Sequence, residues 1–256
     1  MEWNWNRAVA VVGTRKITNY GKEVTRQIIA GLVSAGCFIV SGLAYGVDAV
    51  AHATAIETGG FTIAVLGCGV DVIHPVSNTL LYNEIVNGKG WVISEYPVGQ
   101  FATVGLFPAR NRIISALSRG VVVTEGAFDS GALITARFAA EQGKDVFAVP
   151  GPITSSLSEG PMILMKNGAK PVAKAEDVLE ELNIRNKPIS TNNSITNKPM
   201  NKNEKIIIEL LENENLHLDE IVRKSGIPAA KLGSILTVME MKGWLKNTGG
   251  MYGIRN

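Results

Sequence analysis

Residues 107–151 read FPARNRIISALSRGVVVTEGAFDSGALITARFAAEQGKDVFAVPG. Two helical patterns, opening at Pro108 and at Ser130, alternate in this segment with apolar β-runs. The β-runs cover residues 120–125 and 145–149, and glycine or proline stands at nearly every junction. Strands that alternate with helices in this way form a mostly parallel sheet covered by helices. We therefore expect an α/β fold.

Polar side chains of the same segment stand where such a sheet binds ligands. In a helix opening near Pro108, Arg110 lies on the side of the apolar stripe, at the helix N-terminus. Arg110 and the Ser130-Gly131 turn should then overhang one crevice at the carboxyl edge of the sheet. Free N–H groups, a helix dipole and a guanidinium all favour an anion there. The competing interpretation is a surface arginine and a serine that is only an N-cap.

Gly13-Thr14-Arg15 is a second candidate anion site. It follows the apolar run of residues 7–12 and precedes a helical pattern from about residue 20 to residue 35. Strand, glycine turn and helix N-terminus in that order can cradle a phosphate, although the sequence is neither GxGxxG nor a Walker motif. Because a capping turn does not need a guanidinium, Arg15 favours a ligand role over that of a solvated arginine.

Ser41-Gly42 ends the next predicted strand, residues 37–40, and so stands at the same edge of the sheet. Asp48, a little further on, can cap a helix or accept from a ligand or a neighbouring arginine. His52 lies one helical turn beyond Asp48. The pair would suit general acid and base chemistry, but a neutral histidine bonded to a carboxylate is more often structural. We expect no catalytic residue here.

The composition excludes several classes of protein. The chain has 256 residues and a net charge of +2, so any basic footprint must be local. No run approaches the ~18 apolar residues that a membrane span needs, and the N-terminus lacks the apolar core of a signal peptide. Cys37 and Cys68 lie in or beside apolar runs, and no cluster has metal-ligand spacing. We expect a cytoplasmic protein without metal, cofactor or membrane contact.

Residues 183–203 are a predicted flexible linker, because they are polar and rich in asparagine and lysine. They separate an α/β domain, residues 1–182, from residues 204–256. Three helical patterns and a hairpin around Gly249-Gly250 give the second segment the plan of a winged helix. Its predicted third helix has few charges on the outer face, so duplex DNA and protein are both possible partners.

Several segments, in collinear order, resemble the DprA/Smf family of DNA-processing proteins. They are GTRKITNYG, SGLAYGVDAVAH, FTIAVLGCGVDVIHP, FPARNRIISALS, SGALITA and DVFAVPG. The resemblance implies an extended Rossmann-like domain with a doubly wound sheet that binds single-stranded DNA, followed by a winged helix. It further implies a homodimer, not an enzyme, that protects incoming strands during natural transformation and loads the RecA recombinase onto them.

The crevice and the family motifs together give one set of candidate DNA-binding residues. The family's Gly-Ser/Thr-Arg motif matches Gly13-Thr14-Arg15, its Arg-Asn-Arg motif matches residues 110–112, and its Ser-Gly motif matches Ser130-Gly131. A basic residue is usual in the family at the position of Lys144. The set is Gly13, Thr14, Arg15, Ser41, Gly42, Arg110, Asn111, Arg112, Ser130, Gly131 and Lys144. Aromatic platforms accompany such basic grooves in single-strand binders. The candidates for that role are Tyr20, Tyr45, Phe101 and Phe107.

The sequence departs from the family pattern in three places. Only seven residues precede Ala8, where many relatives carry a helical domain. Pro161-Met162 stands where relatives usually have a residue followed by asparagine, which affects that loop and any dimer surface nearby. His74 stands where a tyrosine is common.

A second interpretation is an enzyme that hydrolyses nucleotides, similar to the lysine-decarboxylase-like phosphoribohydrolases. Those enzymes need a Gly-Gly-x-Gly-Thr-x-x-Glu turn, whereas residues 131–135 read GALIT here and the carboxylate is absent. Glu125 is nearby, but it closes a strand and is expected to pair with an arginine. A third interpretation is a crevice that senses a small nucleotide, with the DNA work left to the winged helix.

Overall fold

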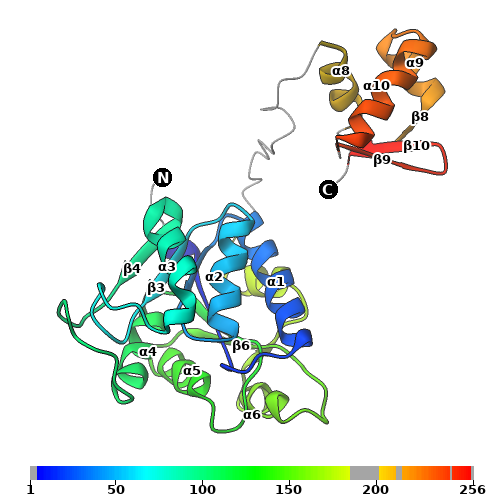
Figure 1. Cartoon of the computed structure of the whole chain (residues 1–256). Helices are drawn as coiled ribbons and strands as arrows, with labels where there is room; N and C mark the ends of the chain where they lie inside the picture. The colour runs from blue at the N-terminus through cyan, green and yellow to red at the C-terminus, as the bar shows by residue number, and fades with distance from the viewer. Residues whose placement is uncertain (1–4, 185–201, 212–214, 243, 255–256) are drawn as a thin grey trace. The chain divides into compact units, whose positions relative to one another are not determined.

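The computed structural model describes residues 5–184, 202–211, 215–242 and 244–254. The chain divides into two compact units, Met1–Ile189 and Ser190–Asn256 (Figure 1). The first is built around a seven-stranded sheet and the second around a three-stranded sheet. Most of the predicted linker, residues 183–203, lies outside the described residues, so its flexibility stays a prediction.

All strands of the large sheet pair in parallel, in the order β4-β3-β2-β1-β5-β6-β7. The chain builds the sheet outward from β1 to β4, then returns to the other side of β1 and continues to β7. The carboxyl ends of β1 and β5 are therefore the topological switch point of a doubly wound sheet, which confirms the predicted fold class. The strands are β1 (Ala8–Val12), β2 (Phe38–Ser41), β3 (Thr62–Val65), β4 (Gly90–Ile93), β5 (Gly120–Val123), β6 (Asp145–Ala148) and β7 (Lys170–Pro171).

Helices cover both faces of this sheet. Val9 and Val11 pack under α1, α2 and α7, whereas Ala8, Ala10 and Val12 pack under α4, α5 and α6. Successive residues of a strand point to opposite faces, so burial on both sides explains why these strands read as continuous apolar runs. The helices are α1 (Asn19–Ser34), α2 (Val47–Glu57), α3 (Thr79–Glu84), α4 (Leu106–Ala116), α5 (Gly131–Glu141), α6 (Glu159–Lys166) and α7 (Ala175–Glu181).

Short helical turns complete the first unit. They are η1 (Trp5–Arg7), η2 (Val76–Asn78), η3 (Ile85–Lys89) and η4 (Ser156–Ser158). Among the described residues, no helix has both the length and the apolar character that crossing a lipid bilayer demands.

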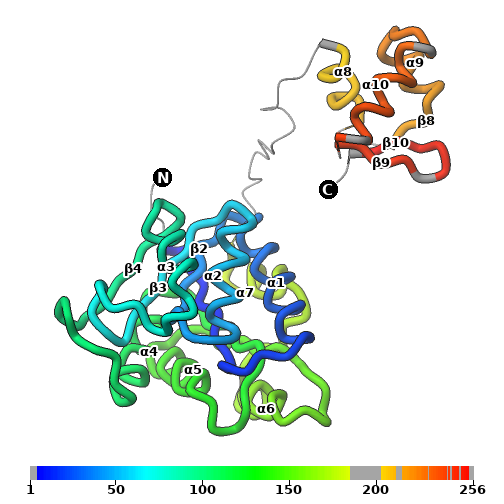
Figure 2. The backbone as a smooth tube through the Cα atoms, in the orientation of Figure 1, coloured from blue at the N-terminus to red at the C-terminus, as the bar shows by residue number. Residues whose placement is uncertain are grey.

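The second unit is a winged helix, as predicted. Its elements are α8 (Lys202–Leu211), β8 (Leu216–His217), α9 (Leu218–Ser225), α10 (Ala229–Met241), β9 (Leu245–Thr248) and β10 (Met251–Ile254). The tube in Figure 2 follows β9 into β10 as the hairpin, and the two-residue strand β8, which the sequence pattern missed, pairs with β10. Leu232, Leu236 and Trp244 lie in its core.

Candidate nucleic-acid interface

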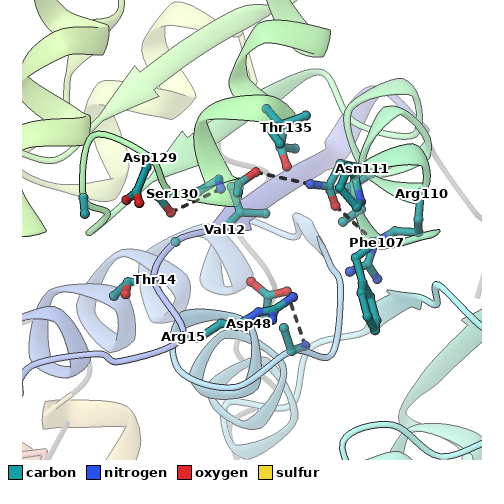
Figure 3. A pocket seen from close by; sticks show the side chains of 18 of the residues that line it. Val12, Thr14, Arg15, Asp48, Phe107, Arg110, Asn111, Asp129, Ser130 and Thr135 are labelled. Atoms are coloured by element: carbon teal, nitrogen blue, oxygen red, sulfur yellow. Dashed lines mark hydrogen bonds between the residues drawn. The ribbon is translucent and has the colours of Figure 1, made fainter. Parts of the chain in front are cut away.

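A pocket of about 490 Å³ opens at the switch point of the large sheet. It lies between the carboxyl end of β1, the start of α2 and the first turns of α4 and α5. Its lining residues are Val12, Gly13, Thr14, Arg15, Lys16, Ala44, Asp48, Val104, Phe107, Pro108, Arg110, Asn111, Ile114, Ala127, Asp129, Ser130, Gly131, Ala132, Ile134 and Thr135. In Figure 3, Ser130, Asn111 and Thr135 lie along one side of the hollow, and Arg15 and Asp48 along the other.

The pocket brings together most of the candidate residues from segments far apart in the sequence. Those that line it are Gly13, Thr14, Arg15, Arg110, Asn111, Ser130 and Gly131. Those that do not are Ser41, Gly42, Arg112 and Lys144. The structure therefore has the crevice that the strand and helix pattern predicted, but fewer of the candidate residues line it than expected.

The Gly13-Thr14 turn ties β1 to its neighbours. Thr14 N donates to Glu125 O at 2.7 Å, and Thr14 O accepts from Val47 N at 3.1 Å. A Cβ on Gly13 would lie 2.5 Å from Val47 Cγ2 and 2.7 Å from Glu125 O, so only glycine fits. Because the Thr14 amide is already bonded, it is not free to help cradle a phosphate in the way that the sequence pattern predicted for this turn. The turn instead fixes the backbone from which Arg15 projects.

Glu125 holds the start of α1 beside this turn. Its buried carboxylate accepts from Thr18 Oγ1 at 2.6 Å and from Thr18 N at 2.9 Å. Thr18 is the N-cap of α1 and its hydroxyl accepts from Gly21 N at 3.0 Å. The expectation that Glu125 pairs with an arginine is wrong, since these hydrogen-bond donors are neutral.

Arg15 stands exposed at the mouth of the pocket. Its guanidinium lies over the ring of Phe107, 5.4 Å from the ring centre, a cation–π contact that restrains the side chain. The ring of Phe107 also contacts His74, with 5.4 Å between ring centres. None of the ion pairs among the described residues involves Arg15, so its charge is available to an anion. Lys16, exposed beside it and missed as a candidate, adds a second cation.

Arg110 does not overhang the crevice as expected, because it is 4% exposed. Its Nη1 donates to Gly42 O at 2.8 Å and to Val65 O, and its Nε donates to Asn111 Oδ1 at 3.2 Å. Burial lowers the pKa of Arg110, while the carboxylate of Asp48 opposes that shift. The guanidinium therefore ties α4 to the ends of β2 and β3 and contributes to the pocket only as part of its wall.

Asp48 is a buried carboxylate on the same wall, 6% exposed. Its Oδ2 accepts from Gly42 N at 3.0 Å and from Ala44 N at 3.4 Å. Burial raises the pKa of Asp48, and nearby Arg110 and the backbone donors act against that rise. The N-cap position of α2 belongs to Gly46, so Asp48 does not cap this helix.

His52 is structural. Its Nε2 accepts from Leu43 N at 3.3 Å, which places the proton on Nδ1, 2.6 Å from Thr62 Oγ1. Thr62 Oγ1 donates in turn to Ile39 O at 2.8 Å. Burial lowers the pKa of His52 to about 3, with Arg110 acting in the same direction, so the ring is neutral. Its partners leave it no role as a proton carrier for Asp48.

Arg112 and Ser41 do not line the pocket. Arg112 is exposed and forms an ion pair with Glu95 on the outer side of α4. Ser41 is buried and its hydroxyl donates to Val11 O at 2.7 Å, which links β2 to β1. Both residues thus stabilise the structure next to the pocket without lining it.

Lys144 lies at the opposite edge of the sheet, so the expectation that it shares the rim is wrong. It directly precedes β6 and therefore stands at the amino end of that strand. Its Nζ donates to Ala116 O at 2.8 Å and to Ser118 O at 2.6 Å, the carbonyl groups at the end of α4. The Lys144 ammonium group thus binds carbonyl groups that the C-terminus of a helix leaves without intrahelical partners.

The N-terminus of α5 faces the pocket. Ser130 is its N-cap, and the serine hydroxyl accepts from Ala132 N at 3.3 Å. A Cβ on Gly131 would meet nothing within 4 Å, so the space in front of this turn is open. Asn111 donates from Nδ2 to Gly131 O at 3.2 Å and holds α4 against α5. The first turn of a helix leaves N–H groups without intrahelical partners, which favours an anion here.

Of the aromatic candidates, Phe107 lines the pocket and the others do not. Tyr20 donates from its hydroxyl to Pro150 O at 2.5 Å. Tyr45 and Phe101 are 49% and 75% exposed, so they offer ring surface outside the pocket. Stacking inside the pocket therefore depends on Phe107.

Comparison with known protein families covers most of the chain. Residues 1–183 match the family of DNA recombination-mediator protein A, and residues 196–251 match the DprA winged helix domain. Protein Smf of Escherichia coli (strain K12) is 39% identical over 249 residues, which are 95% of this chain and 67% of that protein. DNA processing protein DprA of Streptococcus pneumoniae is 47% identical over 173 residues, 68% of this chain and 61% of that protein.

Two solved structures resemble the chain closely. DprA from Streptococcus pneumoniae superposes with a TM-score of 0.64 at 45% identity, covering 68% of this chain and 61% of that one. DNA processing protein A from Helicobacter pylori, whose structure concerns its "unique single-stranded DNA binding mode", gives a TM-score of 0.63 at 33% identity, with 68% and 79% covered. The chain spans 44–67% of the length of its curated relatives. It belongs to the DprA/Smf family of DNA-processing proteins.

Proposed function

We propose that the chain binds single-stranded DNA at the switch-point pocket, with phosphates held by Arg15 and by the N-terminus of α5. The observation that carries the proposal is the convergence of Arg15 and the Ser130-Gly131 turn on one open hollow. The Helicobacter pylori relative, described as a single-stranded DNA binder, supports the same function for this fold. Phe107 lines the pocket beside Arg15 and supplies an aromatic ring next to the proposed phosphate site, as single-strand binders combine the two.

The cations at the pocket set the expected strength and salt dependence of binding. Arg15 and Lys16 are exposed there, and the dipole of α5 adds partial positive charge. Neutralising about two or three phosphates gives a log–log slope of affinity against salt of roughly −1.4 to −2.1 for a single strand. Anisotropy titrations of a mixed-sequence oligonucleotide at several salt concentrations measure this slope. A slope near zero would contradict phosphate binding at this pocket.

In the cell, the proposed role is to protect incoming single strands during natural transformation and to pass them to the RecA recombinase. We propose that a cytoplasmic homodimer performs it. Membership of the DprA/Smf family supports this role. Assembly of RecA on DNA covered by single-strand-binding protein, with and without the chain, tests it. An unchanged assembly rate would remove the RecA role and leave DNA binding standing.

A binding function is favoured over nucleotide hydrolysis. The carboxylate that phosphoribohydrolases carry on the helix after their glycine turn is absent from the start of α5, where residues 131–135 read GALIT. Glu125, the nearest substitute considered, is committed to Thr18. Incubating the chain with nucleoside monophosphates and looking for a freed base distinguishes the two classes. Release of base would favour the enzyme.

A further inference from the structure

The pocket contains one buried carboxylate that DNA binding does not use. Asp48 lies on the wall of the pocket and is 6% exposed. Asp48 offsets the charge of the nearby buried Arg110 guanidinium, but a carboxylate on the pocket wall also repels phosphate groups and adds nothing to the binding of a polyanion. It suits a ligand that presents a hydrogen-bond donor at this point.

The backbone fixes the Asp48 carboxylate from one side. Oδ2 accepts from Gly42 N and Ala44 N, and Gly42 O in turn accepts from Arg110 Nη1. The Ser41 side chain also interacts with the carboxylate and lowers its pKa, while its hydroxyl donates to Val11 O. A carboxylate offers about four lone-pair sites, and the two backbone donors both use Oδ2. The group is therefore held rigidly and keeps acceptor capacity for a donor in the pocket.

The remaining walls have the features of a nucleotide site. Arg15 and the N-terminus of α5 form an anion site at the mouth, and Val12, Ile114 and Phe107 supply apolar surface. A volume of about 490 Å³ lies within the range of about 300–1,000 Å³ that small-molecule sites occupy. In the dinucleotide-binding members of this fold class, an acidic side chain that follows the glycine-rich turn accepts from a ribose hydroxyl.

We propose that the pocket binds a ribonucleoside monophosphate, whose ribose 2′-hydroxyl donates to Asp48 while Arg15 and the first turn of α5 hold its phosphate. A deoxyribonucleotide lacks this donor and cannot make the bond. Asp48 is then the residue that distinguishes ribose from deoxyribose. The inference shares its anion site with the proposed DNA-binding function, so a nucleotide and a DNA strand compete for Arg15.

Isothermal titration of the full chain with AMP, dAMP and 2′-fluoro-dAMP tests the proposal without any substitution. AMP should bind about tenfold or more tightly than dAMP, because hydrogen bonds to charged groups are among the stronger ones in proteins. The 2′-fluoro compound should bind like dAMP, since fluorine cannot donate. Equal affinities for AMP and dAMP, or a 2′-fluoro compound as tight as AMP, would overturn it.

Two variants assign the preference to one side chain. Asp48→Asn should bring the ratio of AMP to dAMP affinity close to one. Asp129→Asn, which removes an exposed carboxylate that also lines the pocket, should keep the ratio of the natural chain. A preference that persists in Asp48→Asn would overturn the assignment. If Asp48→Asn does not fold, as thermal unfolding would show, the analogue series decides.

Titration of the same preparation with a mixed-sequence oligonucleotide separates this inference from the proposed function. Binding of DNA without binding of AMP overturns the ribonucleotide site alone. Binding of AMP in preference to dAMP, without binding of DNA, supports the ribonucleotide site and overturns the DNA-binding proposal.

Discussion

Arg110 donates from Nη1 to the carbonyl oxygen of Gly42, 2.8 Å away, inside the protein. A Cβ at Gly42 would lie 2.5 Å from Arg110 Nη2, so the guanidinium fills the space that the glycine leaves. Arg110, which the sequence motif suggested as a phosphate ligand, therefore holds α4 against β2 and β3.

Replacing Arg110 by alanine should lower the free energy of unfolding by about 3–5 kcal/mol, because buried acceptors at Gly42 and Val65 and the Asp48 carboxylate lose their cation. Arg112→Ala, which removes an exposed partner of Glu95, should cost less than about 1 kcal/mol. Urea denaturation measures both. Equal stability of the two variants would show that Arg110 is not part of the buried framework.

Thr18→Ala should destabilise the first unit by about 1–2 kcal/mol, because the N-cap of α1 and its bond to Glu125 are lost together. Thr18→Ser keeps the hydroxyl and should lie within about 0.5 kcal/mol of the natural chain. Urea denaturation again provides the comparison. A serine variant as unstable as the alanine variant would assign the effect to the methyl group instead.

His52 should make the fold sensitive to mild acid. Burial lowers the pKa of His52 in the folded state to about 3 from its usual value of 6.5, so its stabilising contribution is present above pH 6.5 and is lost as the pH falls towards 3. Between pH 7.5 and pH 5 the loss should be about 2 kcal/mol. Urea denaturation at the two pH values measures it. In His52→Asn, whose amide can still donate to Thr62, this pH dependence should shrink; an equal loss in both chains would argue against His52 as its source.

The architecture could be predicted because its determinants are local. Alternating apolar strands and helices, with glycine or proline at nearly every junction, indicate a mostly parallel sheet covered by helices. The doubly wound order of the strands was implied by the family resemblance. Gly13 directly follows β1, and Ser130 caps the helix that follows β5, so the chain order fixes which edge of the sheet they share. The winged helix could be predicted in the same way, from its three helical patterns and its hairpin.

The roles of single cations were harder to predict, because they depend on burial and on distant backbone. Arg110 shares a helix side with Ile114, a signal of burial that its charge obscured. Lys144 precedes its strand whereas the pocket residues follow theirs, so the sequence already placed it at the other edge. The hydrogen bonds between Thr18 and Glu125 join residues that are separated by several helices and strands in the sequence, and no sequence pattern reveals them.

Affinity for single-stranded DNA in Arg15→Ala, with Lys144→Ala as the matched control, tests the switch-point site most directly. Loss of Arg15 should weaken binding about tenfold for any sequence and reduce the salt slope by about 0.7. Loss of Lys144, a cation at the opposite edge of the sheet, should leave affinity unchanged. Unchanged binding by Arg15→Ala, or an equal loss in both variants, would contradict DNA binding at this pocket.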